Sequence, residues 1–527
     1  MQNLKNLIIT NYFPIILFFF SIFICHYTGS RGVFPIDSFS HFDSGYRILQ
    51  GDHPFKDYWV VSGPFLDYWQ SLIFLLFGAN WQTYLLSSSI LNCLLTLTTY
   101  FLFLNLGLHK KISFFYAICF SILAYPSSGT IFVDHHSAFM SILALYVLIW
   151  AMIKDKNYFW FLIPLLAILA FLSKQVPSGY VFVIILLVFF YHLFFENKKK
   201  IIRIISITFF SCMLSLFFLI FFFKINSIDL KSFLIQYINY PGSIGTNRLE
   251  NVNFNFKNLF IDFKFIYLSF FILTFLIIQN LLKEKSYYKK INFKIFLIFL
   301  FLFCFLIFHI LLTKNQIFIF FLIPLLCGLA HSELIKQKSN NVKSYIKYIL
   351  IILCIGTTLK YHIRFNVERK FHELKDVNFS YSVNASQLDN KFVGLKWITP
   401  GTTSQKSAQS QLEYFIGVKN LLKNDKNKKI VITNYSIFSV ILNENVSGYT
   451  RWFPGDDSAY PTQSSKFFKE YKEFVLKTIK NKKIQNIYVL PDVKETYFTD
   501  FVEIKCIDRK KIELEIIKFE IKNVKCF

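Results

Sequence analysis

The chain has 527 residues, of which 54% are apolar and only 17% are charged. Soluble domains carry about a quarter charged residues, so this composition excludes an ordinary water-soluble enzyme, and the apolar content also excludes a disordered chain. The formal net charge of +25 would indicate nucleic-acid binding in a soluble protein. In residues 1–361, however, most basic side chains lie in short breaks between apolar runs, as membrane topology requires. We therefore predict an integral membrane protein with no nucleic-acid partner.

Eleven apolar segments are candidates for membrane-spanning helices, because a span needs about 20 mostly apolar residues. The expected spans are residues 7–27, 81–106, 111–126, 133–153, 158–172, 179–195, 204–223, 259–282, 291–312, 317–335 and 344–361. The breaks between them alternate between short basic stretches and longer or more neutral ones, and positive charge marks the cytoplasmic side. This pattern predicts an inner (plasma) membrane protein with a cytoplasmic N-terminus and an extracytoplasmic C-terminus.

Two further regions do not read as spans. Residues 64–78 are apolar but only about 15 long, which suits a helix lying along the membrane interface. In the polar tail, strand-like runs at 429–433 and 484–490 flank an amphipathic helix at 464–480. The expected fold class is mainly α. A polytopic membrane domain of residues 1–361, with an interfacial helical first outer loop, precedes a small extracytoplasmic α/β domain of residues 362–527.

The cysteines form no metal-binding spacing. Seven of the nine lie in apolar runs, where a thiol behaves as a small hydrophobic group. Cys506 and Cys526 lie in the polar tail and can pair if that tail faces an oxidising compartment. We predict no metal site and no cofactor, although the proposed chemistry leaves room for a divalent cation.

Acidic side chains gather in the first outward loop. Residues 1–361 contain thirteen carboxylates, and five of them lie in this loop, namely Asp37, Asp43, Asp52, Asp57 and Asp67. Charged groups beside a membrane are costly when buried and are often functional. We interpret Asp52 and Asp57 as solvated loop residues next to the headgroups, whereas the sequence around Asp37 indicates a function.

This loop reads Ile36-Asp37-Ser38-Phe39-Ser40-His41-Phe42-Asp43-Ser44-Gly45-Tyr46-Arg47-Ile48-Leu49-Gln50-Gly51-Asp52, followed by Gly63-Pro64 and Leu76-Phe77-Gly78. It resembles the first extracytoplasmic loop of GT-C-type membrane glycosyltransferases, the superfamily of aminoarabinose transferases and protein O-mannosyltransferases. Ala170-Phe171-Leu172-Ser173-Lys174-Gln175 resembles a Lys-Gln turn of some members.

The resemblance implies a helix along the membrane after the first span, a polyprenyl-phosphate sugar donor, and Asp37 as the catalytic base. The second acid of the family's Asp-Glu pair is Ser38 in this chain. That departure puts in doubt any role that needs two adjacent carboxylates, including a metal site. Asp43 is a candidate substitute for the missing acid.

Several other polar residues are candidates for binding the substrates. A lipid-linked phosphate needs positive charge or hydrogen-bond donors, and Lys174 and Gln175 lie in a short outward turn, where Lys174 could instead snorkel to the headgroups. The further candidates are His41, Arg47, Asp134, His135 and Arg248. Asp134 and His135 open a span and can contact phosphate or a divalent ion, or Asp134 can simply cap the helix.

Three features have a structural interpretation that is simpler than a functional one. The outward loop 224–258 is long enough to form a lid, but we interpret it as an ordinary loop. The Trp452–Asp457 segment can bind sugar or form a plain turn. His309 lies in an apolar run, and we expect it to be a satisfied core residue.

These features together predict an inverting glycosyltransferase. It would move a sugar from a polyprenyl-phosphate donor to an extracytoplasmic glycan, lipid or protein, with a carboxylate taking the acceptor proton and stabilising positive charge at the anomeric carbon. A non-enzymatic transporter or lipid-glycan flippase is the alternative, and it would place polar groups near the bilayer midplane. A glycan polymerase or ligase is a third possibility, and it would need its charged cluster in a long later loop.

Overall fold

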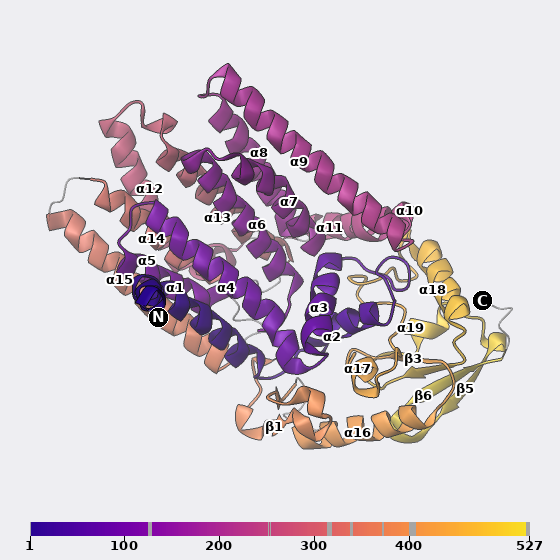
Figure 1. Cartoon of the computed structure of the whole chain (residues 1–527). Coiled ribbons are helices and arrows are strands. Elements are labelled where there is room, and N and C mark those ends of the chain that lie inside the picture. Colours follow the sequence, from indigo (N-terminus) through magenta and orange to yellow (C-terminus); the bar gives the residue numbers. More distant parts are fainter. Residues whose placement is uncertain are drawn as a thin grey trace.

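The computed structural model describes residues 2–124, 129–250, 252, 255–313, 319–337, 341–370, 374–399 and 407–522. They form a helical bundle with a small sheet near the C-terminal end of the chain (Figure 1). Eight of the described helices are long and apolar enough to cross a membrane, which indicates an integral membrane protein. They are α1 (Gln2–Gly29), α4 (Trp81–Asn105), α6 (Val133–Lys154), α8 (Gln175–Leu193), α9 (Lys198–Ile225), α12 (Lys264–Lys283), α13 (Ile291–Thr313) and α15 (Asn341–Tyr361) with its π-helical continuation η5 (His362–Val367).

Three of the eleven predicted spans form shorter helices. They are α5 (Lys110–Ala124), α7 (Asn157–Ser173) and α14 (Leu322–Ile335), the last preceded by the 3₁₀ turn η4 (Ile319–Phe321). At 1.5 Å per residue, helices of 14 to 17 residues rise only about 21–26 Å, less than the ~30 Å hydrocarbon core. Helix length thus supports eight spans, and the count of eleven and the orientation of the chain stay predictions.

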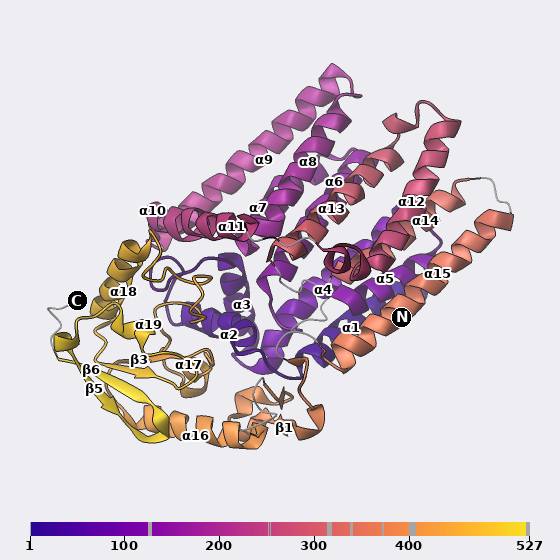
Figure 2. The same ribbon diagram turned by 180° about the vertical axis from the view of Figure 1, so that it is seen from behind.

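The bundle is organised around α6. In the most apolar stretch of α6, 89% of the residues are buried, whereas in that of α9 only 11% are buried. Figures 1 and 2 show α9 at the edge of the bundle, so its exposed Phe209, Phe210 and Phe217 form an outer apolar surface. Helices suit a lipid environment because every internal backbone N–H and C=O finds a partner within the segment.

The first outer loop is helical. α2 (Pro35–Leu49) starts with a proline at its first position and is followed by Gly51, whose φ of +89° suits a glycine. The helix predicted for residues 64–78 is confirmed as α3 (Pro64–Phe77). Figures 1 and 2 both place α2 and α3 between the membrane helices and the tail.

The segment 224–258, which the sequence predicts to face outward, is also largely helical where it is described. It contains the short helix α10 (Leu230–Phe233), the π-helical turn η1 (Leu234–Asn239), the helix α11 (Tyr240–Glu250) and the start of the π-helical turn η2 (Lys257–Ile261). A 3₁₀ turn, η3 (Tyr287–Lys289), links α12 to α13. The simple loop expected for residues 224–258 is therefore wrong, because α11 packs against η1 and α13.

The tail contains a four-stranded sheet with the order β3-β4-β6-β5. Its strands are β3 (Lys429–Ile432), β4 (Asn486–Val489), β5 (Ile507–Lys511) and β6 (Ile517–Ile521), and its helices are α16 (Ala408–Asn424), α17 (Phe438–Leu442), α18 (Phe468–Lys482) and α19 (Thr496–Thr499). The predicted strand, amphipathic helix and strand are confirmed as β3, α18 and β4, and β3 runs parallel to β4.

The antiparallel hairpin of β5 and β6 was not expected from the sequence, because β5 is rich in charged residues and mostly exposed. Smaller elements complete the tail, namely η7 (Phe379–Tyr381), β1 (Val383–Asn384), η8 (Ala385–Gln387), η9 (Asn390–Phe392), β2 (Lys396–Trp397), η10 (Ile504–Cys506) and η11 (Glu513–Glu515). Cys506 is disulfide-bonded, and Cys526 lies outside the described residues.

The tail packs onto the first outer loop through aromatic side chains. Phe39 of α2 stacks on Trp397 with ring centroids 5.8 Å apart, and Phe42 lies 5.6 Å from Phe392. On the other side of the loop, Trp59 packs against Tyr471 of α18 at 5.0 Å. These contacts hold the tail against α2 and the loop that follows it, beside the candidate site.

Two glycines in the helical bundle make a matched test of this packing. A Cβ on Gly328 of α14 would lie 2.3 Å from Cζ of the buried Phe103, while a Cβ on Gly356 of α15 would meet nothing within 4 Å. Overpacking a core costs about 1–3 kcal/mol, and Gly→Ala in an open helix position is neutral or stabilising. We therefore expect Gly328→Ala to lower the thermal unfolding midpoint in detergent and Gly356→Ala to leave it unchanged or raise it. Equal midpoints for the two variants would contradict this packing.

Candidate functional site

A cavity of about 820 Å³ lies where the first outer loop, the membrane helices and the tail meet. We call it the α2 cavity. It is lined by the start of α2 and the loop that follows α2, by the adjoining ends of α6, α7, α8 and α13, by η1 and α11, and by a loop of the tail. Its polar and ionisable lining residues are Asp37, Ser40, His41, Ser62, Asp134, Lys174, Gln175, Arg248, His309, Thr313, Trp452, Asp456 and Ser458.

Six of the nine residues predicted for the site line this cavity. They are Asp37, His41, Asp134, Lys174, Gln175 and Arg248. These residues come from α2, α6, the junction of α7 and α8, and α11, so segments up to about 200 residues apart in the sequence contribute to one site. The cavity therefore unites side chains that the sequence marked separately.

Asp37 and His41 share one face of α2, because residues four apart on a helix are neighbours. The backbone N–H of Phe34 donates to the Ser38 hydroxyl over 2.8 Å, and Ser38 is buried. Ser38 occupies the position of the second acid in the GT-C-type pattern that this loop resembles. In this chain its hydroxyl stabilises the start of α2. A pair of adjacent carboxylates is absent here, and Asp37 is the carboxylate that α2 brings to the cavity.

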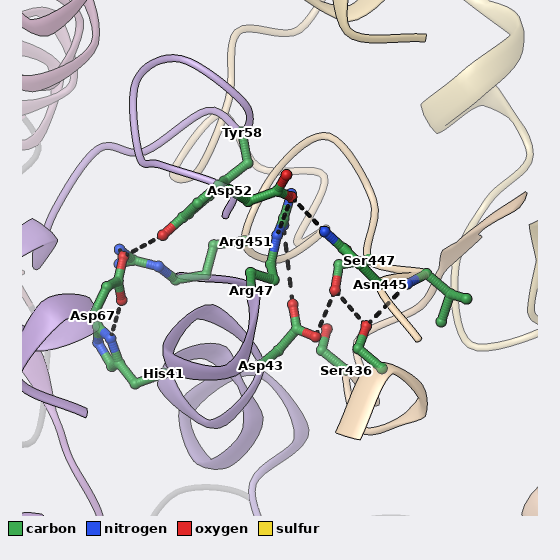
Figure 3. A network of polar contacts seen from close by, with 12 residues as sticks. His41, Asp43, Arg47, Asp52, Tyr58, Asp67, Ser436, Asn445, Ser447 and Arg451 are labelled. Carbon is green, nitrogen blue, oxygen red and sulfur yellow. Dashed lines mark hydrogen bonds and ion pairs between the residues drawn. The ribbon is translucent and has the colours of Figure 1, made fainter. Parts of the chain in front are cut away.

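His41 is held by a buried carboxylate, Asp67 (Figure 3). The His41 Nδ1 lies 2.7 Å from Asp67 Oδ1, and the Tyr58 hydroxyl donates to Oδ2 over 2.9 Å. The guanidinium of Arg451, from the tail, also donates to Asp67. Burial, with a further contribution from Arg451, lowers the pKa of His41, so the imidazole is neutral at pH 7. When the Nδ1–H group of His41 donates a hydrogen bond to Asp67, Nε2 carries no proton and can accept one.

Lys174 is paired with a buried acid at the membrane side of the cavity. Its Nζ lies 2.6 Å from Asp134 Oδ1, and the Nε2 of His309 lies 3.1 Å from the same oxygen. Asp134 and His309 are buried, while a fifth of the Lys174 side chain is exposed. The ion pair keeps the ammonium at the cavity wall, which differs from a lysine that snorkels away to the headgroups.

Gln175 has a positioning role. Its amide nitrogen donates to the carbonyl oxygens of Val61, over 2.8 Å, and of Tyr237. It therefore joins the first outer loop to the segment that leads into α11. Arg248 lies on α11, is exposed, and completes the set of cations along the cavity.

Asp43 and Arg47 do not line the cavity but connect α2 to the tail. Arg47 is fully buried, and its guanidinium lies 3.9 Å from Asp43 and 3.4 Å from Asp52. The hydroxyl of Ser447 donates to Asp43 over 2.6 Å, and the amide of Asn445 donates to Asp52 over 2.8 Å (Figure 3). These contacts give Asp43 and Arg47 a structural role, and a substrate contact for either residue stays a prediction.

The expectation of a solvated Asp52 is wrong. The side chain is buried, and Lys482 of α18 also binds it. Burial alone would raise the pKa of Asp52, but Arg47 and Lys482 hold it below its usual value, so the carboxylate is ionised. The sequence places Lys482 430 residues away, which is why the pattern near Asp52 alone could not predict this pairing.

His135 also lies outside the cavity lining of the described residues. Its ring packs beside Phe132 at 5.4 Å and Phe139 at 5.8 Å. Adjacent residues on a helix point about 100° apart, so with Asp134 facing the cavity, His135 is turned into the bundle.

Two contacts at the candidate site could not be predicted from the sequence. His309 lines the cavity and binds Asp134, although it was expected to be an ordinary core residue. Its position near the end of α13 is the one signal that points to the cavity. Arg451, the partner of Asp67, carries no signal in its own neighbourhood, because the two residues are 384 positions apart.

The chemistry that this arrangement allows is proton transfer next to an anionic group. Asp37 and neutral His41 can accept a proton, and Lys174 and Arg248 can bind negative charge. Among the described residues, no group of three or more His, Cys, Asp or Glu side chains is arranged to hold a metal ion.

No protein-family model matches the chain, and no curated protein matches it significantly.

Asp67 provides a sharp test of how the site is held together. Asp67→Asn keeps the shape of the side chain but leaves the buried guanidinium of Arg451 without its carboxylate. Removing one partner of a buried pair costs about 3–5 kcal/mol, so we expect a thermal unfolding midpoint several degrees below that of the parent protein in detergent.

The matched control is Asp57→Asn in the same loop. Asp57 is half-buried and accepts a hydrogen bond from the backbone N–H of His53 over 2.8 Å, which an asparagine oxygen can also accept. The free energy of unfolding of this variant should fall by less than about 1 kcal/mol. Similar losses of stability for the two variants would show that the contacts of Asp67 do not stabilise the site as proposed.

Proposed function

We propose that the protein is an inverting membrane glycosyltransferase that uses a polyprenyl-phosphate sugar as donor. The observation that carries this proposal is the α2 cavity, in which a carboxylate from the first outer loop shares one space with two cations of the membrane domain. A volume of about 820 Å³ is in the range of pockets for small ligands. Its apolar lining residues, among them Ile131, Phe171 and Leu312, suit the first carbons of a lipid chain.

Asp37 is the proposed base. The acceptor hydroxyl gives its proton to the Asp37 carboxylate while its oxygen attacks the anomeric carbon. The bond from that carbon to the phosphate oxygen breaks on the opposite face, and the electron pair leaves with the polyprenyl phosphate. One displacement of this kind inverts the anomeric centre.

Lys174 and Arg248 are the proposed partners of the phosphate. Charge-assisted hydrogen bonds to phosphate are about twice as strong as neutral ones, and they stabilise the charge that develops on the leaving group. Asp134 and His309 hold the Lys174 ammonium at the cavity wall. His41, oriented by Asp67, is a second acceptor near Asp37 on the same face of α2.

The proposed location is the inner (plasma) membrane, with the cavity at its outer face. This proposal follows from the basic breaks of the sequence, which favour an inside N-terminus and an outside tail. A lipid-linked donor would then present its headgroup to the cavity from the outer leaflet, and the acceptor would be an extracytoplasmic glycan, lipid or protein.

Asp37→Asn tests the base. We expect kcat for transfer of radiolabelled sugar from a panel of polyprenyl-phosphate sugars to fall about 10²- to 10⁴-fold, because general-base catalysis contributes this much, while donor binding stays within about twofold. The control is Asp229→Asn. Asp229 is exposed, lies outside the cavity lining and caps α10 by accepting a hydrogen bond from the backbone N–H of Ser232, which an asparagine oxygen can also accept.

The two results that would count against the proposal are distinct. Full activity in Asp37→Asn would remove Asp37 from the mechanism while leaving the reaction in place. Absence of any transfer from all donors by the parent protein, in the presence of extracytoplasmic glycan and lipid acceptors, would remove the transferase function.

Orientation is tested by a reporter placed after Phe527. We expect it on the outer side, because the basic breaks favour an inside N-terminus and because eleven crossings are predicted from the sequence. The matched control is the same reporter inserted at Lys198–Lys200, a basic break that should face the cytoplasm. A cytoplasmic signal from the C-terminal reporter would contradict the proposed topology.

A further inference from the structure

The tail contributes its own wall to the α2 cavity. This wall is the loop Arg451–Ser458, of which Trp452, Pro454, Asp456 and Ser458 line the cavity together with Asp37. The loop belongs to a different domain from every other lining segment. A transferase needs an acceptor as well as a donor, and the residues assigned to the donor all come from the membrane domain and its outer loop.

The loop is anchored at both ends to the parts that form the other walls. At its start, the guanidinium of Arg451 donates to the Asp67 carboxylate and to the backbone oxygen of Ser62. Near its end, the hydroxyl of Tyr240, the first residue of α11, donates to the backbone oxygen of Asp457. The cavity residues of the loop are therefore held in place relative to α2 and α11.

The interior of the loop is also fixed. Phe453 is buried and packs against Tyr449 at 5.6 Å and parallel to Tyr497 at 6.4 Å. Gly455 has a φ of +68°, and a Cβ at this position would lie 2.0 Å from the Tyr497 hydroxyl. A side chain at position 455 would clash, so the turn that presents Trp452 and Asp456 requires glycine.

The side chains presented to the cavity are of two kinds. Trp452 is half-buried and offers a large aromatic surface, while Asp456 is exposed and carries a carboxylate that accepts hydrogen bonds from the backbone N–H and the hydroxyl of Ser458. An aromatic ring has a negative face, which attracts the partly positive C–H groups on one side of a sugar ring. A carboxylate beside it accepts hydrogen bonds from sugar hydroxyls.

We propose that Trp452, Asp456 and Ser458 form the acceptor subsite and that the acceptor is an oligosaccharide. This inference rests on the proposed function, since it takes Asp37 as the base that receives the proton of the acceptor hydroxyl. A sugar ring stacked on Trp452 would present a hydroxyl to the cavity that contains Asp37. A protein acceptor or a lipid acceptor without a glycan does not need this combination of a ring and a carboxylate.

Binding is tested first and without any reaction. Saturation-transfer NMR on the full-length protein in detergent, with chitotetraose, maltotetraose and mannotetraose as probes and a serine-containing peptide for comparison, should show binding of at least one oligosaccharide and none of the peptide. Trp452→Ala should weaken that binding about tenfold, which corresponds to ~1.4 kcal/mol. Trp452→Phe should keep most of it, because the aromatic face remains.

Two further variants separate a loss of binding from a loss of folding. Asp456→Asn preserves an oxygen for the Ser458 contact, so it should fold normally and weaken oligosaccharide binding. Tyr381→Ala removes an aromatic side chain of the tail that is 66% exposed and outside the cavity lining, and it should leave binding unchanged. Equal binding by the parent, Trp452→Ala and Asp456→Asn proteins would overturn the subsite, as would preferential binding of the peptide or no binding of any oligosaccharide.

Kinetics then separate this inference from the function on which it rests. In sugar transfer to the bound oligosaccharide, Trp452→Ala should raise the acceptor KM about tenfold with little change in kcat or donor affinity, the opposite of the pattern expected for Asp37→Asn. If no donor is turned over but oligosaccharide binding depends on Trp452, the proposed function falls and the carbohydrate site stands. If transfer proceeds and Trp452→Ala behaves as the parent, the acceptor subsite falls and the transferase stands.

Discussion

One buried carboxylate, Asp67, holds the three parts of the site together. Its oxygens bind His41 of α2, Tyr58 of the following loop and Arg451 of the tail. A carboxylate removed from water costs free energy unless donors replace the lost hydration. Because these donors come from three different segments, Asp67 is satisfied only when the outer loop and the tail have reached their final positions. The same constraint gives His41 its orientation at the cavity.

Apolar and polar contacts make different contributions to the docking of the tail. The aromatic contacts of Phe39, Phe42 and Trp59 remove apolar surface from water but are not strongly directional. Hydrogen-bonded ion pairs have defined geometry, and leaving one half made is costly in a buried setting. The Asp67 pair and the Arg47 cluster with Asp43 and Asp52 lie on either side of α2 in Figure 3, so they select one docked arrangement among those that the apolar surfaces allow.

How much of the site could be predicted depended on the range of each interaction. Asp37 was predicted because the stretch that contains it and His41 resembles the first outer loop of GT-C-type glycosyltransferases, and one helix, α2, carries both residues. Lys174 was found because a charged residue between two apolar runs is conspicuous. Asp52 was misjudged and Arg451 was missed, since their partners Lys482 and Asp67 lie about 400 positions away. No local pattern specifies a contact across that separation, because only the packed chain brings the two segments together.

The sequence by itself determined that the chain is a membrane protein of many helices, that its acids gather in the first outer loop, and that its tail contains a strand, an amphipathic helix and a strand. These features follow from hydrophobic periodicity and from the cost of charge in lipid, which act over one element at a time. Only the tertiary structure decided which acids bind arginine and which face a cavity, and that a tail loop completes that cavity. Those outcomes depend on distances between segments remote in the chain, and they are set by the burial of the surfaces between them.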